Sequence, residues 1–365
     1  MDRTPQRREK LVESLRADGV AALLVASVTN VSYLTGFSGD DSTLIVGPGG
    51  AVVISDGRYE TQLAQECPGL EVHIRPVGQP MVDGVAAIAS KLGVRNLGFE
   101  STACTFAEYE DLRGKLSGVE LAPVKGRVEE LRAIKDEDEI AAIREAIGYA
   151  ERAFARLRAG IKIGQSEKDV ADDLEDYLRR AGATGASFPP IVAVGRRAAL
   201  PHARPTPETK VGDDDFLLVD WGATGRPYKS DLTRMVVTGK VTDEFERHYR
   251  LVLEAQERGI AAIRPGVAAR DVDAEARSVI ERAGLDRYFD HGLGHGIGMD
   301  IHEAPRLRKE SDVTLQPGMV VTVEPGIYLP DWGGIRIEDD ILVTPDGCEV
   351  MTHVPKSLDQ VRPAG

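Results

Sequence analysis

The segment HGLGHGIGMDIHEAP (291–305) is the most informative part of the chain. It holds three of the chain's seven histidines, His291, His295 and His302, within twelve residues. Glycines alternate with them, and a residue without a Cβ lets the backbone approach another group closely. A single histidine is more often structural, but three on a glycine-rich backbone indicate a binding or catalytic site.

Two further segments have a common pattern: VDWGATGRPYKSD (219–231) and VEPGIYLPDWGGIRIED (323–339). In each, an apolar strand ends in an acid, a loop with glycine and proline follows, and a returning strand carries a second acid. A buried carboxylate costs several kcal/mol unless it is paired or bound to metal. Any one acid alone is equally well explained as a loop residue, but four on paired strands indicate a site. These acids are Asp220, Asp231, Glu324 and Glu338.

Carboxylates combined with imidazole suit a hard or borderline divalent ion. Four acids and a histidine exceed the ligands that one catalytic ion takes, whereas two ions about 3.5–4 Å apart could share them. Such a pair lowers the pKa of a bridging water and polarises a carbonyl, which is the chemistry of amide hydrolysis. The three cysteines are far apart and form no CxxC, which argues against a thiolate zinc site and favours a reducing compartment.

Composition narrows the class of protein. A chain of 365 residues predicts roughly two domains, and 42% hydrophobic residues suffice for packed cores. The net charge of −14 disfavours nucleic acid as a partner. The sequence contains no run of about 18 apolar residues, the length that would predict a membrane span. Residues 1–15 lack the apolar region of a signal peptide. We expect a cytoplasmic protein.

Hydrophobic periodicity predicts an α+β protein with two domains. Helical and strand patterns alternate in the first third, which indicates a small α/β domain with a mixed sheet and a hairpin turn at 48–50. The pattern loosens over 118–134, so we place a linker there and the domains at 1–128 and 129–365. The second domain is predicted to have helices at 135–159, 166–181, 243–264 and 268–283, and strands at 216–220, 232–239, 319–325 and 334–344.

Five motifs together resemble the pita-bread family of metallopeptidases, and within it the Xaa-Pro peptidases, aminopeptidase P and prolidase. They occur in family order and are FPPIVAVGRRAALPHARP (188–205), VDWGA…KSDLTR, HGLGHGIGMDIHEAP, VTVEPGIY and GIRIEDD. YLTGFSG (33–39) and DGRY (56–59) extend the resemblance into the first domain. The resemblance implies a C-terminal pita-bread catalytic domain behind a creatinase/prolidase-type N-terminal domain.

The resemblance also implies the metal ligands. They would be Asp220, Asp231, His295, Glu324 and Glu338, with Asp231 and Glu338 bridging two divalent ions. Glu324 would in addition act as the general acid/base beside the bridging water. Mn²⁺ is the expected metal, with Co²⁺ or Zn²⁺ as alternatives.

Four other residues are expected on the substrate side. His202 and His302 would orient the peptide and stabilise the tetrahedral intermediate, and His202 would shape a proline pocket. His291 would lie at the pocket edge. Arg336 would hold a ligand carboxylate, and it completes a catalytic set with Glu324, His202 and His302. Short peptides with proline at the second position are the implied substrates, and a homodimer is the implied assembly.

Two activities remain open within this resemblance. An aminopeptidase P releases the first residue from longer Xaa-Pro chains, and the loop YLTGFSG favours this interpretation. A prolidase cleaves Xaa-Pro dipeptides and needs a cation for the proline carboxylate. Arg306 could serve, although an exposed arginine beside Arg308 and Lys309 is the simpler explanation. A methionine aminopeptidase, a metal-free creatinase-type hydrolase and an inactive pita-bread binding protein are more distant alternatives, and the complete ligand set argues against the last two.

Overall fold

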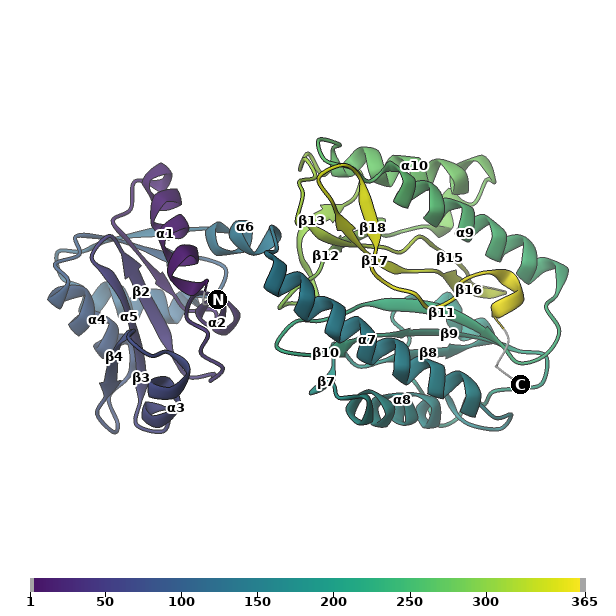
Figure 1. Cartoon of the computed structure of the whole chain (residues 1–365), viewed down its shortest axis with the longest axis horizontal. Coiled ribbons are helices and arrows are strands. Elements are labelled where there is room, and N and C mark those ends of the chain that lie inside the picture. Colours follow the sequence, from purple (N-terminus) through teal and green to yellow (C-terminus); the bar gives the residue numbers. More distant parts are fainter. Residues whose placement is uncertain (1–2, 362–365) are drawn as a thin grey trace. The chain divides into compact units, whose positions relative to one another are not determined.

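The computed structural model describes residues 3–361, which form two compact units that divide between Arg132 and Ala133 (Figure 1). The N-terminal unit contains a six-stranded sheet of order β4-β3-β2-β1-β5-β6. Strands β1, β2 and β3 pair antiparallel, and the other neighbours pair parallel, so the predicted mixed sheet is confirmed. The strands are β1 (Ala22–Val25), β2 (Thr43–Gly47), β3 (Gly50–Asp56), β4 (Glu71–Arg75), β5 (Asn96–Glu100) and β6 (Glu120–Val124).

The expected linker over 118–134 is wrong, because this stretch contains strand β6 and helix α6 (Arg127–Ala133). Strand β6 lies at the edge of the sheet and contains Pro123, which an edge strand tolerates but which weakens the strand signal in the sequence. The boundary drawn after residue 128 falls inside α6. The remaining helices of this unit are α1 (Thr4–Leu15), α2 (Val28–Thr35), α3 (Glu60–Glu66), α4 (Met81–Lys91) and α5 (Phe106–Lys115), with the 3₁₀ turn η1 (Arg16–Asp18).

The first half of the C-terminal unit packs two helices on a three-stranded antiparallel sheet of order β11-β9-β8. Helix α7 begins with a capping box, in which Asp136 and Glu139 satisfy each other's backbone amides. Strands β9 and β11 form the predicted hairpin, with Asp220 opposite Thr233. The elements are α7 (Glu137–Gly160), α8 (Glu167–Ala181), β7 (Gly185–Ala186), β8 (Ile191–Val194), η2 (Gly195–Ala199), β9 (Phe216–Trp221), β10 (Ala223–Thr224) and β11 (Leu232–Val237).

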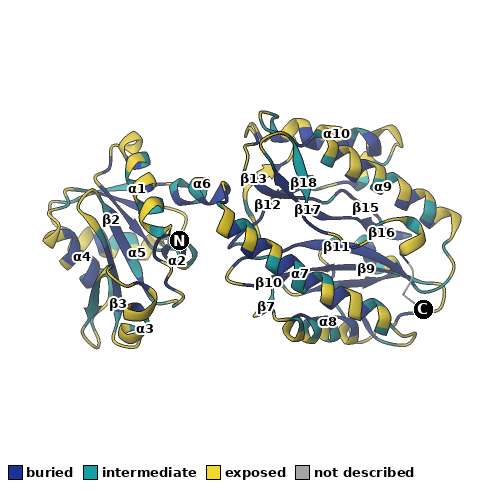
Figure 2. Cartoon of the chain, in the orientation of Figure 1, coloured by how far each residue is buried: buried dark blue, intermediate teal, exposed yellow. Residues whose placement is uncertain are grey.

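The second half repeats this plan with a five-stranded antiparallel sheet of order β13-β12-β14-β17-β18 under two helices. The strands lie between α9/α10 and α7/α8, and their buried side chains form the cores (Figures 1 and 2). This arrangement confirms the α+β class. The elements are α9 (Asp243–Ala262), α10 (Ala269–Arg282), η3 (Asp286–Tyr288), β12 (Gly294–Gly296), β13 (Glu303–Leu307), β14 (Val320–Val323), β15 (Gly326–Leu329), β16 (Gly333–Arg336), β17 (Asp339–Val343), β18 (Cys348–Val350) and η4 (Leu358–Gln360).

The single strand expected over 334–344 is in fact two strands in different sheets. Strand β16 pairs with β15 in a separate hairpin, whereas β17 pairs with β14. Between them, Glu338 forms an isolated bridge to Thr233 of β11 and donates its backbone N–H to the Thr233 carbonyl (3.2 Å). The change of partner turns the chain at Glu338, so this acid lies at a strand end, as Glu324 does between β14 and β15.

Within residues 3–361, no helix combines the length and the apolar character needed to cross a membrane.

Close backbone packing at β12 leads to a stability prediction. A Cβ on Gly294 would lie 2.0 Å from the carbonyl oxygen of Thr322 on β14. Because both atoms belong to central strands, we expect Gly294→Ala to lower the free energy of unfolding by at least about 2 kcal/mol. Gly185→Ala is the matched control, since its Cβ would meet nothing within 4 Å. Urea denaturation compares the two, and equal midpoints would contradict the packing argument.

Candidate active site

All ten residues expected at the site line one cavity of about 770 Å³ within the C-terminal unit. They come from six separate parts of the chain, so the fold brings together what the sequence keeps apart. The ten are Asp220, Asp231, His295, Glu324, Glu338, His202, His302, His291, Arg306 and Arg336.

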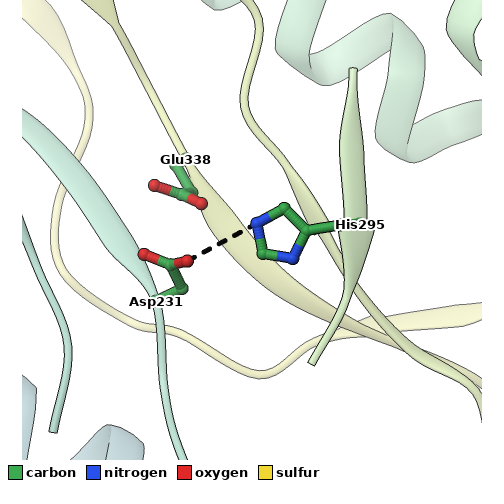
Figure 3. Close-up of side chains that lie close together, drawn as sticks. All are labelled: Asp231, His295 and Glu338. Carbon is green, nitrogen blue, oxygen red and sulfur yellow. Dashed lines mark ion pairs between the residues drawn. The ribbon is translucent and has the colours of Figure 1, made fainter. Parts of the chain in front are cut away.

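Three of the expected metal ligands form a compact group in the lining of this cavity. One ligand atom from each of Asp231, His295 and Glu338 lies within 4.8 Å of the other two (Figure 3). Figure 3 shows the three side chains, which come from separate segments of the chain, lying close together. Nε2 of His295 is 3.6 Å from Oδ2 of Asp231 and 3.3 Å from Oε1 of Glu324. Three carboxylates therefore surround one imidazole.

The hydrogen bonds of His295 define which ring nitrogen is free. Nδ1 lies 3.0 Å from the carbonyl oxygen of Gly296, which can only accept, so Nδ1 carries the proton. Burial lowers the pKa of His295 to about 3, so the ring is neutral. Nε2 therefore directs a lone pair toward carboxylate oxygens. This arrangement is repulsive unless a cation lies between them. A metal-bound histidine typically donates its other ring N–H to a backbone carbonyl in this way.

The carboxylates point to the same conclusion. Burial, followed by the charges of Glu338 and Asp220, raises the pKa of Asp231 well above its ordinary value. Burial likewise raises the pKa of Glu338, with Glu324 and Asp220 adding to it, and raises that of Glu324 to about 7. Within the described chain, Oδ1 of Asp220 is buried with no hydrogen-bond partner. Oxygen ligands, a neutral imidazole and an orphaned carboxylate oxygen fit divalent metal ions.

Arg336 connects the carboxylates to the rest of the cavity. Its Nη2 donates to Oδ2 of Asp220 (2.6 Å), and its Nε donates to Oγ1 of Thr233 (3.0 Å). Thr233 in turn donates to Oε2 of Glu338 (2.6 Å). One guanidinium thus fixes two carboxylates from opposite halves of the unit. Burial opposes its charge, but Tyr328, Asp220 and Glu338 raise the pKa of Arg336 well above the ordinary value.

The three cavity histidines other than His295 differ in how many hydrogen bonds their rings make. His291 uses both ring nitrogens, with Nδ1 against the Gly292 carbonyl (2.8 Å) and Nε2 against the Tyr328 hydroxyl (2.9 Å). His302 packs edge-on against His295, with ring centroids 4.4 Å apart, and is exposed toward the cavity. His202 is exposed as well. The two exposed histidines have ring nitrogens available for a substrate.

Several lining residues were not expected from the sequence. Tyr328 accepts a hydrogen bond from Nη1 of Arg336 (2.8 Å) and lies between Arg336 and His291. Its position in VTVEPGIY, four residues after a candidate ligand, is the one signal that pointed to it. Arg204, Arg308 and Asp290 add charged groups to the lining, and an apolar wall is formed by Phe188, Pro189, Pro190, Ile191 and Pro201.

Family models match both units. Residues 141–345 match metallopeptidase family M24, and residues 7–134 match the creatinase/prolidase N-terminal domain. The first match covers more than half of the chain. The protein therefore belongs to metallopeptidase family M24 and is a peptide hydrolase, as the five motifs suggested.

Similar proteins span the whole chain. A curated relative named Xaa-Pro dipeptidase, from Pyrococcus horikoshii, is 33% identical over 98% of this chain and 100% of its own length. The solved structure of an Xaa-Pro dipeptidase from Bacillus anthracis superposes with a TM-score of 0.94 at 39% identity, covering 97% and 99% of the two chains. An X-Pro aminopeptidase structure from Thermotoga maritima gives 0.87 at 34% identity, covering 94% and 99%.

The geometry makes Asp231 a test of the metal centre. We expect Asp231→Asn to lower the affinity for Mn²⁺ at least about tenfold. The asparagine amide offers one ligand oxygen instead of two and carries no negative charge. Calorimetric titration and elemental analysis of the Mn²⁺-loaded protein measure this. Asp213→Asn, in an exposed loop, is the matched control. Full metal content in the Asp231 variant would exclude this residue as a ligand.

Proposed function

We propose that this protein is a metal-dependent Xaa-Pro dipeptidase, that is, a prolidase. This reverses the preference that the loop YLTGFSG suggested, because the comparisons support the prolidase alternative better than aminopeptidase P. The names of full-length relatives contribute to this proposal. The structural observation that carries it is the position of Arg306 relative to the metal ligands.

Arg306 lies on β13 directly opposite His295 on β12. Side chains of directly opposed residues in an antiparallel pair lie on the same face, with Cβ atoms about 4.5–5.5 Å apart. Both residues line the cavity, so the Arg306 side chain starts from the strand position beside His295 and lies in the same cavity as the candidate metal ligands. A dipeptide bound with its scissile carbonyl at the metal ligands has its proline carboxylate one residue further on. The geometry suits a cation that binds this carboxylate.

The metal is proposed as a pair of divalent ions, most simply Mn²⁺, with Co²⁺ or Zn²⁺ as alternatives. Asp220, Asp231, His295, Glu324 and Glu338 would hold them, with Asp231 and Glu338 shared between the two ions. When bound, such ions polarise the scissile carbonyl and make water a stronger nucleophile.

The chain's own residues would then handle the substrate and the proton. Glu324 accepts a proton from the attacking water and delivers it to the proline nitrogen, which cannot leave as an anion. His302 and His202 donate hydrogen bonds to the substrate oxygens. Arg336 keeps Asp220 in place while charge develops. The apolar wall of prolines and Phe188 receives the proline ring. Homodimeric assembly and a cytoplasmic location stay predictions.

Aminopeptidase P is the second candidate, favoured by the likeness to the Thermotoga maritima structure. Hydrolysis of Ala-Pro and Ala-Pro-Ala in Mn²⁺, before and after chelation, separates the two activities. We expect rapid cleavage of Ala-Pro, cleavage of Ala-Pro-Ala at least about tenfold slower, and loss of both on chelation. The reverse order would make the enzyme an aminopeptidase P. Metal-loaded protein that cleaves neither would refute the Xaa-Pro assignment.

Arg306 gives a residue-level prediction. We expect Arg306→Ala to raise the KM for Ala-Pro by about 10- to 100-fold, the value of a lost charged hydrogen bond. The same variant should cleave Ala-Pro-amide about as well as the wild type does, because that substrate has no carboxylate to lose. Lys309→Ala, on the adjacent exposed segment, is the control. Equal losses on both substrates would show that Arg306 does not bind the carboxylate.

A further inference from the structure

His202 lies on a loop that lines the cavity. The loop runs from the 3₁₀ turn η2 to Thr206, and its residues 201–205 all line the cavity. Within the described residues, the His202 side chain makes no hydrogen bond, and the neighbouring Leu200 is 52% exposed. The position of His202 therefore depends on how the backbone on either side of it is held.

Both ends of this loop are bound by one carboxylate, that of Glu167 at the start of α8. Its Oε1 accepts from the backbone N–H of Val194 (2.9 Å), and its Oε2 accepts from the backbone N–H of Thr206 (3.1 Å). The Glu167 side chain is 0% exposed. A buried carboxylate is tolerated only where its oxygens are satisfied, so these bonds form in a region that water does not reach.

Arg197, inside the loop, completes the arrangement. Its Nε donates to both oxygens of Glu167 (2.9 Å each), and its Nη2 donates to the carbonyl oxygen of Arg204 (2.7 Å). The guanidinium thus joins the buried carboxylate to the backbone two residues beyond His202. Charge-assisted bonds of this kind are stronger than neutral ones and fix direction as well as distance.

The backbone of α8 adds to this attachment. The N–H groups of Glu167 and Lys168 donate to the carbonyl oxygens of Thr209 (3.0 Å) and Thr206 (3.1 Å). On the cavity side, Nη1 of Arg336 donates to the carbonyl oxygen of Pro201 (3.3 Å). The loop is therefore held at its start, middle and end, and His202 stands between the attachments.

We propose that Glu167 and Arg197 are positioning residues that hold His202 at the peptide cavity, although neither lines the cavity itself. The role of His202 in this inference rests on the proposed function, whereas the attachment of the loop does not. A displaced His202 would lose its contact with the substrate without disturbing the candidate metal ligands, which lie on other elements.

A double-mutant cycle tests the coupling between Glu167 and His202. In Glu167→Gln the amide NH₂ cannot accept, so it faces a backbone N–H as donor against donor. We expect kcat/KM for Ala-Pro to fall about 10- to 100-fold, as for a catalytic group displaced by about 1 Å. His202→Ala should fall similarly, and the double variant should lose no more than His202→Ala alone. Mn²⁺ binding should be unchanged. Additive losses, or normal activity in Glu167→Gln, would overturn the proposal.

Hydrogen–deuterium exchange tests the attachment without any substrate. Glu167→Gln should speed exchange in peptides covering 194–206, which contain both amides bound to the carboxylate. Glu175→Gln, a half-exposed acid on the same helix, is the matched control and should change neither exchange nor activity. Unchanged exchange in Glu167→Gln would refute the attachment. If the wild type cleaves no Xaa-Pro peptide, the proposed function fails while the exchange result still decides whether Glu167 holds the loop.

Arg197→Lys provides a second variant should Glu167→Gln not fold. Lysine keeps the charge beside Glu167 but cannot also reach the Arg204 carbonyl with a planar fork. We expect Arg197→Lys to speed hydrogen exchange over 198–206 and to lower kcat/KM for Ala-Pro. In the His202→Ala background, adding Arg197→Lys should lower kcat/KM no further. Wild-type exchange and activity in Arg197→Lys would remove Arg197 from the arrangement.

Discussion

Four carboxylates, those of Asp220, Asp231, Glu324 and Glu338, line a single cavity, and each has its pKa raised by burial. Burying one ionised carboxylate away from water costs several kcal/mol, and a second negative charge a few ångströms away adds to that cost. Arg336, whose guanidinium forms an ion pair with Asp220, balances at most one negative charge. Divalent cations supply what is missing, so the C-terminal unit is organised as a rigid support for a metal centre.

That support extends behind the carboxylates into the sheets. The buried Arg234 donates to the carbonyl oxygens of Thr233 (3.0 Å) and Glu338 (2.5 Å) and to Oδ1 of Asp339 (2.6 Å). Asp340 accepts from the backbone N–H of Asp231 (3.2 Å). The backbones of both candidate bridging ligands are thus fixed by charged residues from a different strand. These pairs hold β11 and β17 in register at the point where β16 and β17 separate.

Much of this unit could be predicted from the sequence, because the acids follow apolar runs and the histidines lie among glycines. The break at Glu338 could not, since GIRIEDDILV contains no glycine or proline after Gly334 to mark a strand end. The break depends on pairing with β15, β14 and Thr233. The local sequence pattern predicts no more for Glu167 than an acid in the first turn of an amphipathic helix. Its partners Arg197 and Thr206 are 30 and 39 residues away, a distance that local patterns do not cover.

The two sides of the cavity are built from different kinds of structure. The candidate metal ligands lie on strands or at their ends, whereas His202 and His302 lie on loops between elements. Loops can change shape and sequence at little cost to the sheets beneath them. With the metal ligands on strands and the substrate histidines on loops, members of the family can keep one hydrolytic chemistry and differ in the length of peptide they accept. The superposition of a dipeptidase and an aminopeptidase on one fold is consistent with this. Arg306 is the exception, because its pairing with His295 ties a substrate-side cation to the strand register.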